Sequence, residues 1–172
     1  MRWSDAPEAV TLHDGRLCLS LATVDGVGLG AEVLTPWPRR RSVQVELEPL
    51  SLDDAAEVVV GVFLYRDDGD ELDAEWSRWG QTGLEAPAFQ FVVPPAEAGR
   101  RLQVSGELPH RVGLTWRRRG ARFRAWREGS ELRWRSSERL HGRGPWFLHI
   151  NVWTLHGVAP SRPMQVCVRS VR

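Results

Sequence analysis

One nine-residue segment, from Glu71 to Trp79, holds the residues whose types and spacing could do chemistry. It reads Glu-Leu-Asp-Ala-Glu-Trp-Ser-Arg-Trp, so acidic and apolar side chains alternate along it. Side chains of a β-strand point alternately to its two faces, and the pattern therefore predicts a strand with an acidic face and an apolar, core-facing side. The acidic face carries Glu71, Asp73 and Glu75. Like charges at this spacing destabilise a strand, which favours a functional reason for keeping them.

Glycoside hydrolysis uses two carboxyl groups on one surface: one attacks the anomeric carbon of the sugar and the other protonates the leaving oxygen. At about 3.3 Å of rise per residue, the Cα atoms of Glu71 and Glu75 would lie about 13 Å apart, and side chains leaning inward by about 4 Å each would leave a gap of about 5 Å. Retaining glycosidases use roughly 5 to 5.5 Å. Repulsion between the carboxylates should keep one of them protonated, as a general acid requires. The spacing thus predicts a nucleophile, a relay and an acid.

Two other interpretations of the acidic strand stay open. It could be a solvated, negatively charged strand, because polar alternation is common on exposed sheet faces. It could also form one edge of a calcium site, since Asp67, Asp68 and Asp70 extend the acidic run upstream. The run does not fit the ligand spacing of an EF-hand loop. We therefore expect no cofactor and no metal ligands, with a structural calcium ion as the unsupported alternative.

The run resembles the active-site strand of the family-16 glycoside hydrolases, a group of β-glucanases and galactanases. On the matching residues, the resemblance implies that Glu71 is the nucleophile, Asp73 assists and Glu75 is the acid/base. It also implies an all-β fold, a jelly-roll β-sandwich of two antiparallel sheets like the concanavalin A-like lectins and glucanases, whose concave sheet carries this strand. Four flanking segments also look like the family: Gly61 to Tyr65, Ser77 to Gly80, Gln90 to Pro94 and His149 to Trp153.

The chain departs from the family pattern in two respects. Its 172 residues are few for this family, and the opening strand and several substrate loops are reduced or absent. Ala74 and Trp76 replace the branched and phenylalanine-like residues that are more usual on the inward side, which we interpret as a repacked core. The single residue between Asp73 and Glu75 is typical of members that act on mixed-linkage glucan, xyloglucan or carrageenan. Laminarin-cutting members usually carry an extra bulge residue.

Length and charge favour one domain, residues 1–172, with a polysaccharide or oligosaccharide as its partner. The net charge is +1, so the overall field favours neither nucleic acid nor an anionic membrane. All 23 basic residues are arginine, which excludes a lysine Schiff base. No stretch approaches the roughly 20 apolar residues of a membrane span. We expect a monomer.

The first ten residues lack a basic start followed by an apolar run, so no secretory signal is visible, whereas the family resemblance implies a secreted or extracellular protein. Cys18 and Cys167 are the only cysteines and lie on expected strands near opposite ends of the chain. In a two-sheet sandwich such strands often pair in the outer sheet. A disulfide is one alternative, but two free thiols are the expectation.

Short alternating runs between turn residues predict an all-β sandwich with no long helix. The twelve expected strands are 16–22, 28–34, 42–47, 58–65, 71–79, 88–93, 101–104, 110–116, 122–127, 132–136, 146–153 and 165–171. Residues 52–57 could form one helical turn, with Ser51 or Asp53 as its cap.

Five further residues are candidate sugar contacts. Along Trp146 to Trp153, alternation puts His149, Asn151 and Trp153 on one face, where they could bond hydroxyl groups and stack on sugar rings. Alternatively, the two polar side chains satisfy buried backbone groups nearby. Trp79 shares the expected carboxylate face and is the first candidate stacking platform, whereas most of the nine tryptophans should be core. Gln90 could bond a sugar hydroxyl.

Two functions follow from these residues. The first is a retaining, endo-acting glycosidase or transglycosylase that cleaves internal β-glycosidic bonds of a glucan or galactan. The second is a non-catalytic, lectin-like carbohydrate-binding domain on the same fold. An intact triad at catalytic separation favours the enzyme, because a binding module has no need of it.

Overall fold

The structure is a computed structural model of the chain. It describes residues 2–4, 7–13, 15–37, 41–53, 55–66, 69–81, 88–94, 100–102, 108–117 and 119–172. For residues 2–4, 7, 13 and 100–102 only the backbone is described. The Asp67 and Asp68 of the acidic run lie outside the described residues.

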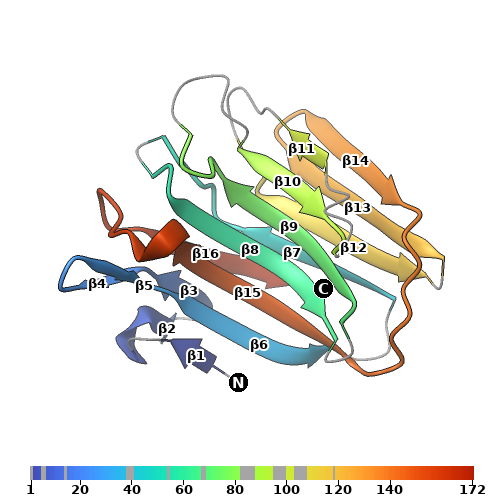
Figure 1. The fold of residues 1–172 in the computed structure, drawn as a ribbon, viewed down its shortest axis with the longest axis horizontal. Helices are drawn as coiled ribbons and strands as arrows, with labels where there is room; N and C mark the ends of the chain where they lie inside the picture. The colour runs from blue at the N-terminus through green and yellow to red at the C-terminus, as the bar shows by residue number, and fades with distance from the viewer. Residues whose placement is uncertain are drawn as a thin grey trace.

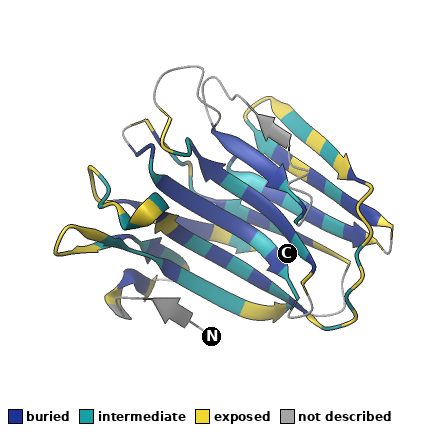
Figure 2. Ribbon diagram, viewed as in Figure 1, coloured by how far each residue is buried: buried dark blue, intermediate teal, exposed yellow. Residues whose placement is uncertain are grey.

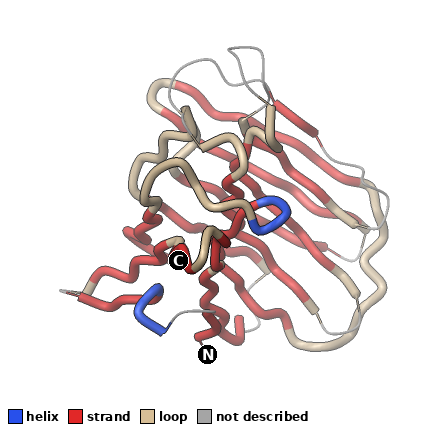
Figure 3. The backbone as a smooth tube through the Cα atoms, turned by 60° about the vertical axis from the view of Figure 1, so that its left-hand side comes forward, coloured by secondary structure: helices blue, strands red, loops and turns tan. Residues whose placement is uncertain are grey.

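Strands make up nearly all of the regular structure. In chain order they are β1 (Arg2–Ser4), β2 (Val10–His13), β3 (Arg16–Ser20), β4 (Ala22–Val24), β5 (Val27–Leu29), β6 (Ala31–Trp37), β7 (Ser42–Leu47), β8 (Val58–Tyr65), β9 (Glu71–Ser77), β10 (Phe89–Val92), β11 (Arg100–Leu102), β12 (Arg111–Arg117), β13 (Gly120–Arg127), β14 (Ser130–Ser136), β15 (Trp146–Thr154) and β16 (Gln165–Val171). Two 3₁₀ turns, η1 (Pro7–Ala9) and η2 (Leu155–Gly157), are the only helical elements in the described part, as Figure 3 shows. Neither is long and apolar enough to cross a membrane.

The strands form two antiparallel sheets that pack face to face (Figure 1). The first sheet has the order β1-β6-β15-β8-β9-β10-β11, and the second has the order β14-β13-β12-β7-β16-β3-β2. The strands β4 and β5 form a separate hairpin. This arrangement confirms the predicted all-β jelly-roll sandwich.

The core fills the space between the two sheets because strand alternation supplies an apolar face to each of them. In the first sheet, Leu72, Ala74 and Trp76 of β9 are fully buried. Phe91 of β10 meets Phe123 of β13 across the layers, with ring centroids 5.2 Å apart. Figure 2 shows buried residues along β8 and β9, and alternation of buried and half-buried residues along β15.

Several sequence expectations need correction. The strand predicted to reach Trp79 ends at Ser77, and the run predicted as 28–34 is divided between β5 and β6. β6 continues through Pro36 to Trp37, although proline usually ends or borders a strand. The helical turn expected over residues 52–57 is instead a pair of tight turns, closed by bonds from Ala55 N to Leu52 O (3.2 Å) and from Val58 N to Ala55 O (3.1 Å).

The two cysteines form a disulfide, so the expectation of free thiols was wrong. Cys18 of β3 and Cys167 of β16 stand opposite each other in the antiparallel register, which places the sulfur atoms within bonding reach. The bond joins residues 149 positions apart in the sequence. Sequence spacing alone does not reveal this pairing, because it depends on which strands of the second sheet become neighbours.

Candidate active site

The outward face of the first sheet brings the candidate residues together in rows across neighbouring strands. Strand register defines one row through Glu75. From β6 to β10, its members are Glu32, Asn151, Gly61, Glu75 and Gln90. The next row runs through Asp73, and its members are Leu34, His149, Phe63, Asp73 and Val92. A third runs through Glu71, and its members are Pro36, Phe147, Tyr65 and Glu71. β8 therefore lies between β9 and β15, and the carboxyl groups of β9 share a sheet face with the predicted sugar contacts of β15.

The three carboxyl groups share this face, as alternation along β9 predicts. Glu71 and Glu75 are half-buried, and Asp73 between them is 8% exposed. The side chains of Glu71 and Asp73 are hydrogen-bonded to each other. Two carboxyl groups can share such a bond only when one of them carries a proton.

Burial and mutual repulsion decide where that proton resides. Burial raises the pKa of Asp73 well above its ordinary value, and the negative charges of Glu71 and Glu75 raise it further. Burial also raises the pKa of Glu71, although the hydrogen bond with Asp73 opposes this effect. Asp73 is thus the proton donor in the pair and Glu71 the acceptor.

Glu75 is held by the strand on its other side. Gln90 of β10 stands opposite Glu75 in the register, and its side-chain amide Nε2 donates a hydrogen bond to Oε2 of Glu75. Gln90 is itself 8% exposed, so its orientation is restricted by packing. The structure therefore places Gln90 where it can position a carboxyl group, and a bond from Gln90 to a sugar hydroxyl stays a prediction.

His149 is fixed by contacts that sequence reasoning missed. Its Nδ1 pairs with Oε1 of Glu32 on β6, and its ring stacks on Phe63 at a centroid distance of 4.6 Å. Tyr65 meets the same ring edge-on at 6.0 Å. The positive charge available to His149 lowers the pKa of Glu71 slightly, against the larger effect of burial. The place of Glu32 in an alternating run was the only sequence signal that could have indicated it. Its pairing with His149 could not be predicted in this way, because 117 residues separate the two.

Asn151 lies over a strand position that has no side chain. A Cβ atom on Gly61 would come within 2.5 Å of Asn151 Oδ1, so the glycine makes room for the amide. Asn151 Oδ1 is buried and has no hydrogen-bond partner within the described residues. The alternative that this oxygen satisfies a nearby backbone group is therefore not supported. Buried polar atoms are normally paired, which leaves this one suited to a ligand hydroxyl.

The two tryptophans differ in how the strands present them. Trp153 extends the face of His149 and Asn151 along β15, and it is 39% exposed. Trp79 lies two residues beyond the end of β9, where its backbone takes a positive φ of 46° and its N–H donates to Ser77 Oγ at 2.9 Å. Strand alternation therefore does not place Trp79 on the carboxylate face. Its contact with a sugar stays a prediction.

No group of three or more His, Cys, Asp or Glu side chains in the described ranges is arranged to hold a metal ion, and the expectation of no metal stays a prediction. The site thus consists of carboxyl groups, amides, an imidazole and exposed aromatic surface.

Solved structures share this architecture. A glycosyl hydrolase family protein from Mycobacterium fortuitum superposes with a TM-score of 0.67 at 16% identity, covering 98% of this chain and 79% of its own. A family-16 endo-glucanase from Bacteroides ovatus, solved with the ligand G4G3G-2F-DNP, gives a TM-score of 0.67 at 11% identity, with 97% and 86% covered. The chain has the fold of the family-16 glycoside hydrolases.

Not every protein with the family-16 fold is described as an active enzyme. The pseudo-β-1,3-glucanase of Mycobacterium tuberculosis, an immunostimulatory antigen, has a TM-score of 0.65 at 18% identity, with 98% of this chain and 78% of its own covered. No family model matches the sequence. No curated protein matches it either. The likeness therefore establishes the family-16 fold, and function rests on the site residues.

Proposed function

We propose that this protein is a retaining, endo-acting glycosidase that cleaves β-glycosidic bonds of a glucan or galactan. The observation that carries the proposal is the row Glu71, Asp73, Glu75 on one face of β9, with the Glu71–Asp73 hydrogen bond. The endo-glucanase from Bacteroides ovatus with the same fold supports the substrate class.

Glu71 would act as the nucleophile and Glu75 as the acid/base. In the form of the enzyme in which Glu75 has also bound a proton, the Glu71 carboxylate attacks the anomeric carbon while Glu75 gives that proton to the glycosidic oxygen, so the C–O bond breaks and a covalent glycosyl-enzyme forms. Glu75, now ionised, removes a proton from water, and the resulting hydroxide displaces Glu71 from the anomeric carbon. Two inversions give net retention, and both carboxyl groups return to their starting states.

Asp73 and Gln90 would support these two roles. A protonated Asp73 removes one negative charge between the glutamates and gives Glu71 a hydrogen bond that fixes its attacking oxygen. Gln90 orients Glu75 from the neighbouring strand. Asn151 and Trp153 would bind the sugar by its hydroxyl groups and its apolar ring face. We further propose an extracellular protein, because the Cys18–Cys167 disulfide suits an oxidising environment.

A lectin-like carbohydrate-binding domain is the second candidate function. The pseudo-glucanase with the same fold favours it, since that architecture need not turn over a substrate. In this case Asn151 and Trp153 would hold the glycan, and the acidic strand would only line its path.

Reducing-end release separates the two functions. Purified protein is incubated with lichenan, xyloglucan, laminarin, agarose and carrageenan, with Glu71→Gln as the paired control. Release from at least one glycan that is lost in Glu71→Gln supports the glycosidase. No release from any glycan, together with retardation in a glycan-containing affinity gel, would overturn catalysis in favour of the lectin-like domain.

A further inference from the structure

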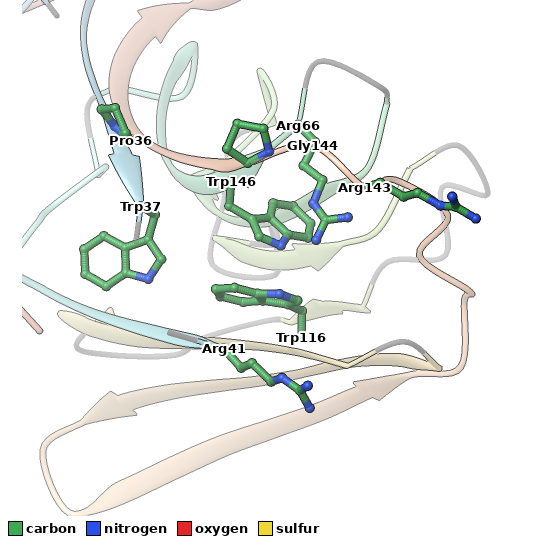
Figure 4. Close-up of a pocket in the computed structure, with 9 residues that line it drawn as sticks. Pro36, Trp37, Arg41, Arg66, Trp116, Arg143, Gly144 and Trp146 are labelled. Atoms are coloured by element: carbon green, nitrogen blue, oxygen red, sulfur yellow. The ribbon is translucent and has the colours of Figure 1, made fainter. Parts of the chain in front are cut away.

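A hollow lies at one end of the sandwich, and its lining includes none of the three carboxyl groups of β9 (Figure 4). It has a volume of about 630 Å³. Three tryptophans line it: Trp37 at the end of β6, Trp116 on β12 and Trp146 at the start of β15. Since β6 and β15 belong to the first sheet and β12 to the second, the hollow opens between the two layers.

The indole rings are held in place. Trp116 and Trp146 pack on each other with centroids 5.2 Å apart and an interplanar angle of 54°. Trp37 Nε1 donates to the carbonyl oxygen of Ser42 at 3.1 Å, which fixes the ring from the other side. Trp116 and Trp146 are buried, so the half-buried Trp37 is the aromatic surface on which a ring-shaped ligand could pack, at little cost in conformational freedom.

The charged side of the hollow is formed by arginines. Arg66 lies 4.1 Å from the ring centroid of Trp146 and pairs with Asp70 at 3.4 Å. Arg41 and Arg143 are exposed and line the same hollow. In Figure 4, Arg41 lies below the Trp116 ring, and Arg143 lies on the far side of the Trp146 ring from Trp37. Three of the nine lining residues are arginines and none is a carboxylate, so the lining is positive although Arg66 is paired with Asp70.

Two buried donors at this site, Trp146 Nε1 and Arg66 Nε, have no hydrogen-bond partner within the part of the chain that the structure describes. Buried N–H groups without acceptors are rare, and a ligand oxygen would satisfy them. Aromatic walls, positive charge and unpaired donors therefore all select for a ring that carries an anionic, oxygen-rich group.

We propose that this hollow binds a pyranose that bears a carboxylate or a sulfate. The half-buried indole of Trp37 would pack on the apolar ring face, and Arg41 or Arg143 would hold the anionic group through charge-assisted hydrogen bonds. Pro36 lines the hollow and also belongs to the row that ends at Glu71, so the site adjoins the proposed glycan-binding face. The preference for a sugar over an aromatic acid rests on the proposed function; the preference for an anion does not.

Direct binding to small probes tests this site without any turnover. Glucuronate, glucose 6-sulfate, glucose and benzoate are titrated by calorimetry and by saturation-transfer NMR. We expect both anionic sugars to bind at least about tenfold more tightly than glucose, because hydrogen bonds between charged groups are roughly twice as strong as those between neutral groups. Arg41→Gln/Arg143→Gln should abolish this preference, and Arg135→Gln, an exposed arginine on β14, should leave it unchanged. Glu71→Gln should also leave it unchanged.

Each opposite result overturns the proposal. Equal affinity for glucuronate and glucose would show that the hollow does not select an anion. A preference for glucuronate that persists in the double arginine variant would show that Arg41 and Arg143 do not bind the anionic group. If benzoate binds as tightly as glucuronate, the hollow does not prefer a sugar, which contradicts the proposed pyranose ligand. Melting curves of the arginine variants exclude unfolding as a trivial cause, since both side chains are exposed. Loss of hydrolysis in Glu71→Gln with intact glucuronate binding would keep this site separate from the proposed glycosidase.

Discussion

Gly61 stands between Asn151 and Glu75 in the first sheet, and its missing side chain leaves the space that the Asn151 amide occupies. A Cβ atom at Gly61 would lie 2.5 Å from Asn151 Oδ1, far closer than two such atoms can pack. The amide is the movable end of a side chain, so a larger residue at this position displaces it without breaking the sheet. The relationship links a backbone feature of β8 directly to the substrate face.

Gly61→Ala should therefore impair the site more than the fold. We expect kcat/KM to fall at least about tenfold, because displaced polar groups misplace the substrate, and the free energy of unfolding to change by about 1 kcal/mol or less. A double-mutant cycle with Asn151→Ala checks the cause. If the glycine acts through the amide, the double variant loses no more activity than Asn151→Ala alone. Fully additive losses would contradict this role.

Trp153→Ala should weaken glycan binding with little change in stability. The ring is 39% exposed, so its removal leaves no cavity in the core. Stacking of aromatic rings contributes about 0.5 to 1.5 kcal/mol, which corresponds to a rise in KM or Kd of up to about tenfold. Trp126→Ala is the matched control, because that half-buried ring lies on the outward face of the second sheet. Equal effects of the two substitutions would contradict a specific role for Trp153.

Asp73→Asn should make stability less dependent on pH. The raised pKa of Asp73 means that the folded protein holds a proton that the unfolded chain releases above its ordinary value of 3.8. The free energy of unfolding therefore falls as pH rises from that value through the raised pKa, and then levels off. Asparagine does not titrate, so the free energy of unfolding of the variant does not fall with pH by this route. The variant should therefore have a higher Tm than the wild type at pH 8, by roughly 2 to 4 °C for each kcal/mol of stability that the wild type loses. Melting curves from pH 4 to 8 measure it; a difference that does not grow with pH would contradict the assignment.

Breaking the disulfide should lower stability without altering the site directly. Cys18 and Cys167 close a loop across 149 sequence positions, so the bond strongly restricts the unfolded chain. Disulfides closing long loops stabilise proteins by about 2 to 5 kcal/mol. Reduction, or Cys18→Ser/Cys167→Ser, should therefore lower Tm by several degrees, which thermal melting with and without reductant would show. An unchanged Tm after reduction would mean that the two sulfurs are not bonded in solution.

Local alternation predicted the central parts of the site. Glu71 to Ser77 and Trp146 to Trp153 each have a clean period of two, so their faces could be assigned before any pairing was known. The contacts between strands could not be predicted in the same way. Glu32 meets His149, and Gln90 meets Glu75, only because of register between segments distant in sequence.

Three errors have identifiable physical causes. The acidic strand ends at Ser77 because the chain turns there. The positive φ of Trp79 in this turn cannot be recognised from the alternation of acidic and apolar residues. β6 runs through Pro36 to Trp37, past the expected strand end at residue 34, although proline usually borders a strand. The cysteine pairing depends on β3 and β16 being neighbours in the second sheet, which two isolated cysteines cannot reveal.

The central claim, that Glu71 forms a covalent bond with the sugar, is tested most directly by trapping the intermediate. A 2-deoxy-2-fluoro glycoside with a dinitrophenyl leaving group lets the nucleophile react but slows release, because fluorine destabilises the oxocarbenium-like transition state. Intact mass and peptide mapping should show one added glycosyl group on Glu71, and none on Glu71→Gln. Labelling of another residue, or a protein that binds the glycoside and stays unlabelled, would contradict the proposed glycosidase.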